Sequence, residues 1–169
     1  MGHFRSKRRV RPTKACAGPV VGAAEALLEI VTEVMKVKVG AYSGDKQQAL
    51  MSQKIRVARL AMELDATIRL WEGHIQDLWD QVKNNDTPSR ERHAEIRAVT
   101  AHVVKKCYDI IDELARCVGS RSFYADSPIQ RFHRDMSSLS THALFEYDHL
   151  SNKYGATRVG LALPTNAMI

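Results

Sequence analysis

The sequence of 169 residues is most informative at first through what it lacks. It contains no run of 18 apolar residues, so no segment is long and apolar enough to be a membrane-spanning helix. Five prolines and nine glycines are too few for the many turns of a β-sandwich or barrel. The three cysteines, Cys16, Cys107 and Cys117, form no Cys-x-x-Cys pair, which excludes zinc-ribbon and thioredoxin-type sites. Free thiols are typical of a reducing compartment, so we expect a cytoplasmic protein whose cysteines belong to the core.

Several catalytic signatures are also missing. The chain has no G-x-G-x-x-G, no G-x-x-x-x-G-K, no H-E-x-x-H and no G-x-S-x-G, so nothing indicates a dinucleotide fold, a P-loop, a zinc protease or a serine hydrolase. Hydrophobic residues make up 44% and charged residues 26%, which is typical of a globular domain. The length predicts one domain.

The net charge of +6 comes entirely from the first 14 residues. That segment holds six of the 25 basic residues and no acid, which leaves 19 basic against 19 acidic residues in the rest of the chain. A short basic run can bind phosphates weakly, so a nucleic-acid arm is the alternative. We expect residues 1–14 to be a disordered, solvated leader and residues 15–165 to form the folded domain.

Helical periodicity dominates the rest. A first helix is predicted over Pro19–Lys38 and a second over Lys46–Lys83, with a turn at Gly40–Asp45 between them and Asp45 as the cap of the second. The second helix would be roughly 57 Å long at 1.5 Å per residue. Its seam steps regularly by four and three residues: Val57, Ala61, Leu64, Ile68, Trp71, Ile75, Leu78 and Val82. We place Leu60, Met62, Leu70 and Trp79 outside that seam, where they are available to a partner.

A third helix is predicted after Thr87 or Ser89 as cap, ending at Gly119. A fourth begins at Ser127-Pro128 and ends at Gly155. No stretch alternates with a period of two, so no strand is predicted. The predicted fold is therefore all-α, an up-down four-helix bundle with short links.

Possible metal ligands occur near the C-terminus. Glu146 and His149 form a single Glu-x-x-His, whereas a carboxylate-bridged di-iron bundle needs two. His142, Glu146 and His149 have the spacing of one helical face, but a polar surface stripe explains them more simply, and we predict no metal site. Trp71 and Trp79 are interpreted as packing residues rather than as an aromatic cofactor box.

One segment carries a denser pattern. Gly119 is followed by Pro128-x-x-Arg131-x-x-Arg134-Asp135, and His142 comes seven residues after the aspartate. Arg131 can pair with Asp135 along the helix, or the arginines can bind carboxylates or phosphates. With the ending Tyr154-Gly155-x-x-Arg158-x-Gly160-Leu161, this pattern resembles the C-terminal domain of acyl-CoA dehydrogenase-like, two-component flavin monooxygenases. The order of helices is similar over about residues 15–163.

The resemblance implies a function as well as a fold. It implies hydroxylation of a small organic substrate, aromatic or polyketide-like, through a flavin C4a-hydroperoxide. Reduced FMN or FAD would come from a separate flavin reductase. His142 would be the catalytic residue that handles the proton, as an imidazole can near neutral pH. Arg131 would bind the cofactor, and Arg134 and Asp135 would have structural or interface roles.

The chain also departs from this family. Members carry an N-terminal helical domain and a central β domain, and their flavin lies between the β domain and the bundle with help from a neighbouring subunit. Neither domain is present here, and Lys46-Gln47-Gln48 stands where acyl-CoA dehydrogenases have an Arg-x-Gln run. Whether the chain is an enzyme is therefore open. The alternative is a non-catalytic accessory or oligomerisation bundle. Either way we expect a homodimer or tetramer, with separately encoded N-terminal domains as possible partners and no membrane or nucleic acid.

Overall fold

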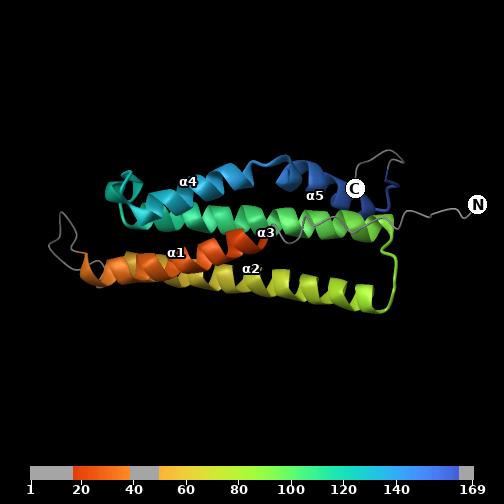
Figure 1. Cartoon of the computed structure of the whole chain (residues 1–169), viewed down its shortest axis with the longest axis horizontal. Coiled ribbons are helices and arrows are strands. Elements are labelled where there is room, and N and C mark those ends of the chain that lie inside the picture. Colours follow the sequence, from red (N-terminus) through yellow and green to blue (C-terminus); the bar gives the residue numbers. More distant parts are fainter. Residues whose placement is uncertain (1–16, 39–49, 164–169) are drawn as a thin grey trace, which may run out of the picture.

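The computed structural model describes residues 17–38 and 50–163, and in these ranges the only regular elements are helices (Figure 1). The described elements are α1 (Gly18–Val37), α2 (Met51–Lys83), α3 (Arg90–Cys117), η3 (Ser120–Phe123), α4 (Pro128–Ser140), η4 (Ala143–Phe145) and α5 (Tyr147–Arg158). Successive long helices run in opposite directions, so the predicted up-down all-α bundle is confirmed. None of the described helices is long and apolar enough to cross a membrane.

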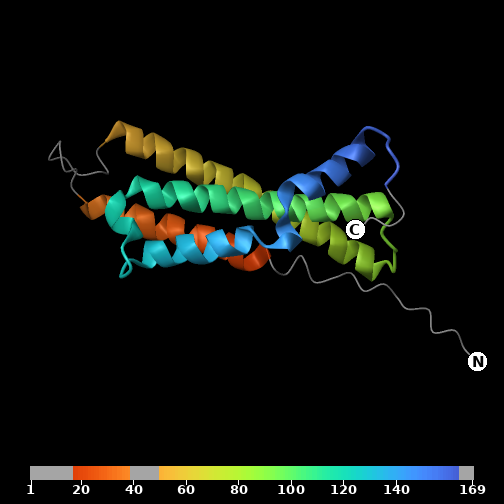
Figure 2. The same cartoon turned by 90° about the horizontal axis from the view of Figure 1, so that it is seen from above.

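Helix α3 is the central element of the bundle. It lies between a layer formed by α1 and α2 and a layer formed by α4 and α5, and it packs against all four (Figure 1). The two helices of the second layer follow each other along α3, with α4 beside its C-terminal part and α5 beside its N-terminal part (Figure 2). The bundle therefore has two different ends.

The boundaries of α3 and α4 follow from local chemistry. The hydroxyl of Ser89 accepts a hydrogen bond from the backbone N–H of Arg92 at 3.2 Å, which caps α3 as predicted. Gly119 follows the end of α3 with φ +81°, a conformation that L side chains rarely adopt. Pro128 occupies the first turn of α4, although the Ser127 side chain makes no capping hydrogen bond.

Helix α2 is shorter at its start than predicted. It begins at Met51 rather than at Lys46, and Leu50 before it is extended (φ −70°, ψ 122°). The predicted turn at Gly40–Asp45, the cap at Asp45 and the leader at residues 1–14 lie outside the described residues. The C-terminal end at Lys83 is as predicted.

The predicted fourth helix is interrupted. Helix α4 ends at Ser140, a short 3-10 turn follows at Ala143–Phe145, and α5 then continues to Arg158. Phe145 is 3% exposed and belongs to the core cluster, so the chain leaves the helical path where this ring turns inward. Gly155 does not end α5, which continues for three more residues.

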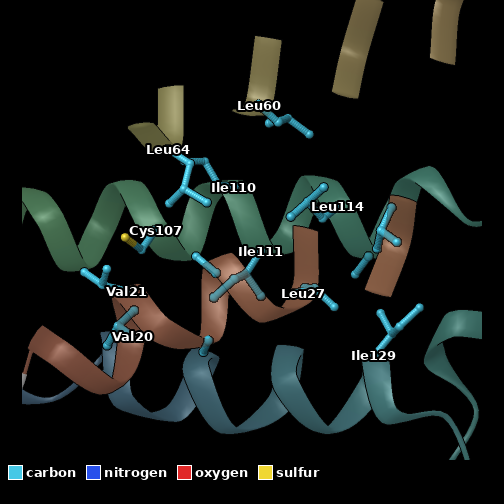
Figure 3. Close-up of a cluster of buried hydrophobic side chains, with 14 of the residues drawn as sticks. Val20, Val21, Leu27, Leu60, Leu64, Cys107, Ile110, Ile111, Leu114 and Ile129 are labelled. Atoms are coloured by element: carbon cyan, nitrogen blue, oxygen red, sulfur yellow. The ribbon is translucent and has the colours of Figure 1, made fainter. Parts of the chain in front are cut away.

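The core is concentrated where four helices meet. Figure 3 shows Leu60 and Leu64 of α2, Ile129 of α4 and residues of α1 converging on Ile110, Ile111 and Leu114 of α3. The placement of Leu60 outside the seam was wrong, because this side chain is 1% exposed. Cys107 and Cys117 are buried free thiols, as expected, while Cys16 lies outside the described residues. Burial raises the pKa of Cys107 to about 12.

The predicted seam of α2 is only partly covered. Ile75 is 37% and Val82 57% exposed, although both continue the stripe that packs on the core at Ile68 and Trp71. Helix α1 begins beside this point: a Cβ added to Gly18 would lie 3.8 Å from Cη2 of Trp71. The shortness of α1 thus explains why Ile75 and Val82 are uncovered, whereas Leu78, between them on the seam, stays buried.

Candidate functional site at the interruption between α4 and α5

A cleft of about 520 Å³ lies where α4 gives way to α5 beside the middle of α3. This volume is in the range of sites for small organic molecules. The lining residues come from all the elements that meet there: Lys105, Tyr108, Asp109, Ser140, Thr141, Ala143, Phe145, Glu146 and Tyr147. The interruption missed by sequence periodicity is therefore what forms this cleft.

Hydroxyl side chains mark the end of α4. Ser140 Oγ donates to the carbonyl oxygen of Ser137 at 2.9 Å, and Thr141 Oγ1 donates to that of Ser138 at 3.0 Å. Such bonds compete with the helical ladder. The run Ser137-Ser138-Leu139-Ser140-Thr141 was the one sequence signal that could have located the interruption.

His142 stands at the start of the 3-10 turn, between two residues that line the cleft. Its Nδ1 accepts a hydrogen bond from the backbone N–H of Leu144 at 3.2 Å, and the ring is exposed to solvent. Since Nδ1 is the acceptor, a neutral imidazole here carries its proton on Nε2. The site therefore presents an oriented N–H donor at the molecular surface.

The α3 side of the cleft is charged and aromatic. Lys105 Nζ forms an ion pair with Asp109 at 2.8 Å, one turn apart, and this hydrogen bond raises the pKa of the lysine. The ring of Tyr147 lies 5.9 Å from that of His102, centroid to centroid. Burial, followed by the charge of Lys106, lowers the pKa of His102, so this neighbour is held neutral near pH 7. The sequence analysis did not single out Lys105, Asp109, His102 or Tyr147. An i, i+4 ion pair such as Lys105–Asp109 is common on helices, so its spacing alone does not indicate a site.

The structure does not bring Arg131 to His142. Arg131 lies near the start of α4 with its side chain 79% exposed, and its Nε is 3.7 Å from Asp135 Oδ2. Arg134 pairs with the same carboxylate at 3.0 Å. The nine residues from Arg131 to the end of α4 rise roughly 14 Å, so Arg131 and His142 are separated by most of the helix. The expected pairing of Arg131 with Asp135 is present, while the cofactor role of Arg131 stays a prediction.

A second cluster on α3 and α4 was missed. His133 Nε2 lies 2.8 Å from Asp112 Oδ1, and Arg116 makes two hydrogen bonds to the same carboxylate. The hydrogen bond from Arg116 lowers the pKa of Asp112. The His133 ring also packs edge-on against Phe123, with centroids 5.4 Å apart. The cluster ties η3 and α4 to α3, which is a structural role that spacing alone did not indicate.

The possible metal ligands near the C-terminus do not form a site. His142, Glu146 and His149 share no helical face, because His142 precedes the 3-10 turn and Glu146 stands at the start of α5. Within residues 17–38 and 50–163 there is no group of three His, Cys, Asp or Glu side chains that could hold a metal ion.

The bundle is characterised by a long second and third helix, followed by a pair of helices that a 3-10 turn separates. The chain belongs to the acyl-CoA dehydrogenase C-terminal domain family, whose model matches residues 15–147. This confirms the resemblance inferred from the Pro128–His142 segment.

Individual relatives point to one branch of that family. The chain is 28% identical over 141 residues to the p-hydroxyphenylacetate 3-hydroxylase oxygenase component of Acinetobacter baumannii, covering 83% of this chain and 33% of the relative. It is 28% identical over 147 residues to a pigment production hydroxylase of Rhodococcus sp., covering 87% and 37%. The crystal structure of the HsaA monooxygenase from M. tuberculosis matches with a TM-score of 0.77 and 25% identity, covering 90% of this chain and 39% of that one.

A further solved structure supports the fold alone. XiaF from Streptomyces sp., in complex with FADH2 and glycerol, matches with a TM-score of 0.84 at 24% identity, over 90% of this chain and 39% of XiaF. The chain spans about a third of the length of the curated hydroxylases that it matches.

Proposed function

We propose that this chain is the helical C-terminal component of a flavin-dependent monooxygenase, and that His142 is its proton-handling residue. The observation that carries the proposal is the exposed, oriented imidazole at the interruption between α4 and α5, in a chain whose relatives are named oxygenase components. The substrate we propose is a small aromatic or polyketide-like compound, since one relative is named for p-hydroxyphenylacetate.

His142 has the chemistry that one edge of a flavin ring needs. The ring edge of a flavin carries oxygen and nitrogen acceptors. In His142 the backbone N–H of Leu144 bonds to Nδ1, so the Nε2–H is the atom that can donate to a flavin acceptor. Reduced FMN or FAD, when bound, supplies the activation of oxygen. The chain's own contribution is to hold a proton at Nε2 and keep the ring oriented through Leu144 N–H.

The described residues fit that edge and not a complete cofactor site. Arg131 is distant from His142 along α4 and largely solvated, so it can reach only a remote part of a cofactor, such as a phosphate. The remaining walls would come from other domains or another subunit. We therefore propose that the active enzyme combines this bundle with the N-terminal and central domains typical of the family, and with a flavin reductase, in the cytoplasm.

An anaerobic titration with reduced FMN, repeated with reduced FAD, tests the role of His142. We expect His142→Ala to weaken binding, whereas the matched control His149→Ala, an exposed histidine of α5, should leave it unchanged. Equal binding by both variants would overturn the assignment. A dissociation constant of about 100 µM corresponds to a binding free energy of roughly −5.5 kcal/mol. If the unmodified chain does not bind reduced flavin at that concentration, this chain alone does not hold the cofactor.

Self-association is the second part of the proposal. Met51, Ile55 and Met62 are 73%, 57% and 67% exposed, and their spacings of four and seven place them on one outer face of α2. Light scattering should give a dimer or tetramer for the unmodified chain and a smaller species for Met62→Glu. The control Lys106→Glu, on an exposed position of α3, should not change the mass. A monomer for the unmodified chain would contradict the expectation.

The same apolar face favours the alternative function, a non-catalytic accessory bundle. That function needs the α2 surface but not His142. An oligomer that binds no reduced flavin, with equal behaviour of His142→Ala and His149→Ala, would support it over the oxygenase component.

A further inference from the structure

The open part of the α2 seam forms an apolar groove that the proposed function does not use. Its volume is about 320 Å³, and it lies at the end of the bundle away from α4. The lining residues belong to the last turns of α2 and the link to α3: Ile75, Gln76, Leu78, Trp79, Gln81, Val82, Asp86 and Pro88. Trp79 and Val82 are each 57% exposed, so a large apolar area faces solvent.

The groove continues the core-facing side of α2. Ile68 and Trp71 pack on the core, and Ile75, Leu78 and Val82 follow at helical spacing. The described part of α1 stops covering this side at Gly18, next to Trp71. The groove therefore begins beside the start of α1, and residues 1–16 precede α1 directly in the sequence.

The groove has an acidic border. Residues 70–86 contain four acids, Glu72, Asp77, Asp80 and Asp86, and one base, Lys83. Asp77 is paired with Arg92 of α3 at 3.2 Å, which leaves an excess of two negative charges at this end of the bundle. Pairing two copies of this face would bring acids against acids, which is unfavourable. A basic occupant is favoured instead.

We infer that residues 1–14 of this chain bind in the groove and cover Trp79. The segment carries six positive charges and no acid, together with the apolar side chains of Phe4 and Val10. Its reach is sufficient, because the 11 residues from Trp71 to Val82 rise only roughly 17 Å, whereas ten extended residues span at most about 36 Å. The basic segment thus has an intramolecular partner at the acidic, uncovered end of the bundle.

The fluorescence of Trp79 tests this inference in the full-length chain. A Trp71→Phe background leaves Trp79 as the single tryptophan, and acrylamide quenching measures how accessible it is. Deleting residues 2–14 should raise the quenching constant about twofold, as a covered indole becomes exposed. A same-length variant with the six basic residues replaced by glutamine should do the same, which separates loss of charge from loss of chain.

A matched pair of charge reversals locates the effect. Asp80→Lys with Asp86→Lys should raise quenching as the deletion does. Glu25→Lys with Glu29→Lys, two exposed acids of α1, should not. A synthetic peptide of residues 1–15, added to the deleted chain, should restore protection at about millimolar concentration, because the linked segment acts at a similar effective concentration.

Two results would overturn the inference. Quenching that is unchanged by the deletion would show that the leader does not cover Trp79. Protection that is lost on dilution, in step with a fall in mass by light scattering, would identify a second copy as the occupant. Circular dichroism of every variant verifies that the bundle remains folded, and neither result bears on flavin binding at His142.

Discussion

The two ends of the bundle use the same helices but are packed very differently. In what we call the four-helix half, α1, residues 51–70 of α2, residues 103–117 of α3 and α4 enclose a core of branched side chains. In the open half, residues 72–83 of α2 pack on residues 90–102 of α3, and α5 is the further helix on α3. Small side chains are frequent among the buried positions of α3 there, which are Ala94, Ile96, Ala98, Thr100 and Ala101. Stability is thus concentrated in one half, while the uncovered surface is concentrated in the other.

The largest test of this contrast is a pair of core truncations. Ile111→Ala, in the four-helix half, removes a side chain that is 0% exposed and should lower the free energy of unfolding by about 2–5 kcal/mol. Val82→Ala, on the same type of stripe in the open half, should cost no more than about 0.5 kcal/mol. Urea denaturation of both variants measures the difference. Similar costs would mean that the open half is covered in solution.

The thiol of Cys107 gives a pH test of the four-helix half. Its pKa is raised from 9.0 to about 12 in the folded chain, so the unfolded chain ionises first as pH rises. The stability that comes from this thiol is complete below pH 9 and is lost as pH rises from 9 toward 12, at about 1 kcal/mol per pH unit.

Comparing the chain with Cys107→Ala isolates this contribution. Denaturation midpoints at pH 8 and pH 10 should fall less in the variant than in the unmodified chain. An identical fall would show that other groups account for the alkaline loss.

Gly119, at the end of α3, should tolerate substitution poorly. Its φ of +81° and ψ of −174° lie in a region that is essentially reserved for glycine. A Cβ there would also lie 3.3 Å from Lys38 Nζ. We expect Gly119→Ala to cost about 1–3 kcal/mol by urea denaturation.

Gly73, in the open half of α2, should behave in the opposite way. It is exposed within a helix, and no atom outside the local backbone lies within 4 Å of an added Cβ. Gly73→Ala should therefore raise the free energy of unfolding by about 0.5–1 kcal/mol. A loss of stability would indicate that another molecule packs closely against this residue.

Local rules account for what the sequence could predict. Ser89 and Gly119 delimit α3 through a side-chain cap and a positive φ, both of which depend on the residues at the boundary. The buried stripe of α3 follows from periodicity in the same way. The family resemblance predicted the order of the helices, and it rested mainly on the pattern between Gly119 and His142.

Tertiary relations account for what the sequence could not predict. Leu60 is buried because α3 approaches α2 from its side of the seam, and Val82 is exposed because α1 begins too late to cover it. The interruption after Ser140 depends on Phe145 finding space against α3, and no proline or glycine announces it. The cleft beside His142 could not be predicted for the same reason, since its lining residues, from Lys105 to Tyr147, are up to 42 positions apart in the sequence.

The central position of α3 has a consequence for how the molecule opens. Every other helix is held by the same 28-residue rod, so α5 can detach without disturbing the four-helix half, but α3 cannot loosen without releasing all its neighbours. Backbone amides in the second part of α3 should then exchange with solvent only when the whole chain unfolds, while those of α5 exchange through small local openings. The cleft at His142 lies between these two regimes, with one wall fixed on α3 and the other on the segment that is released most easily.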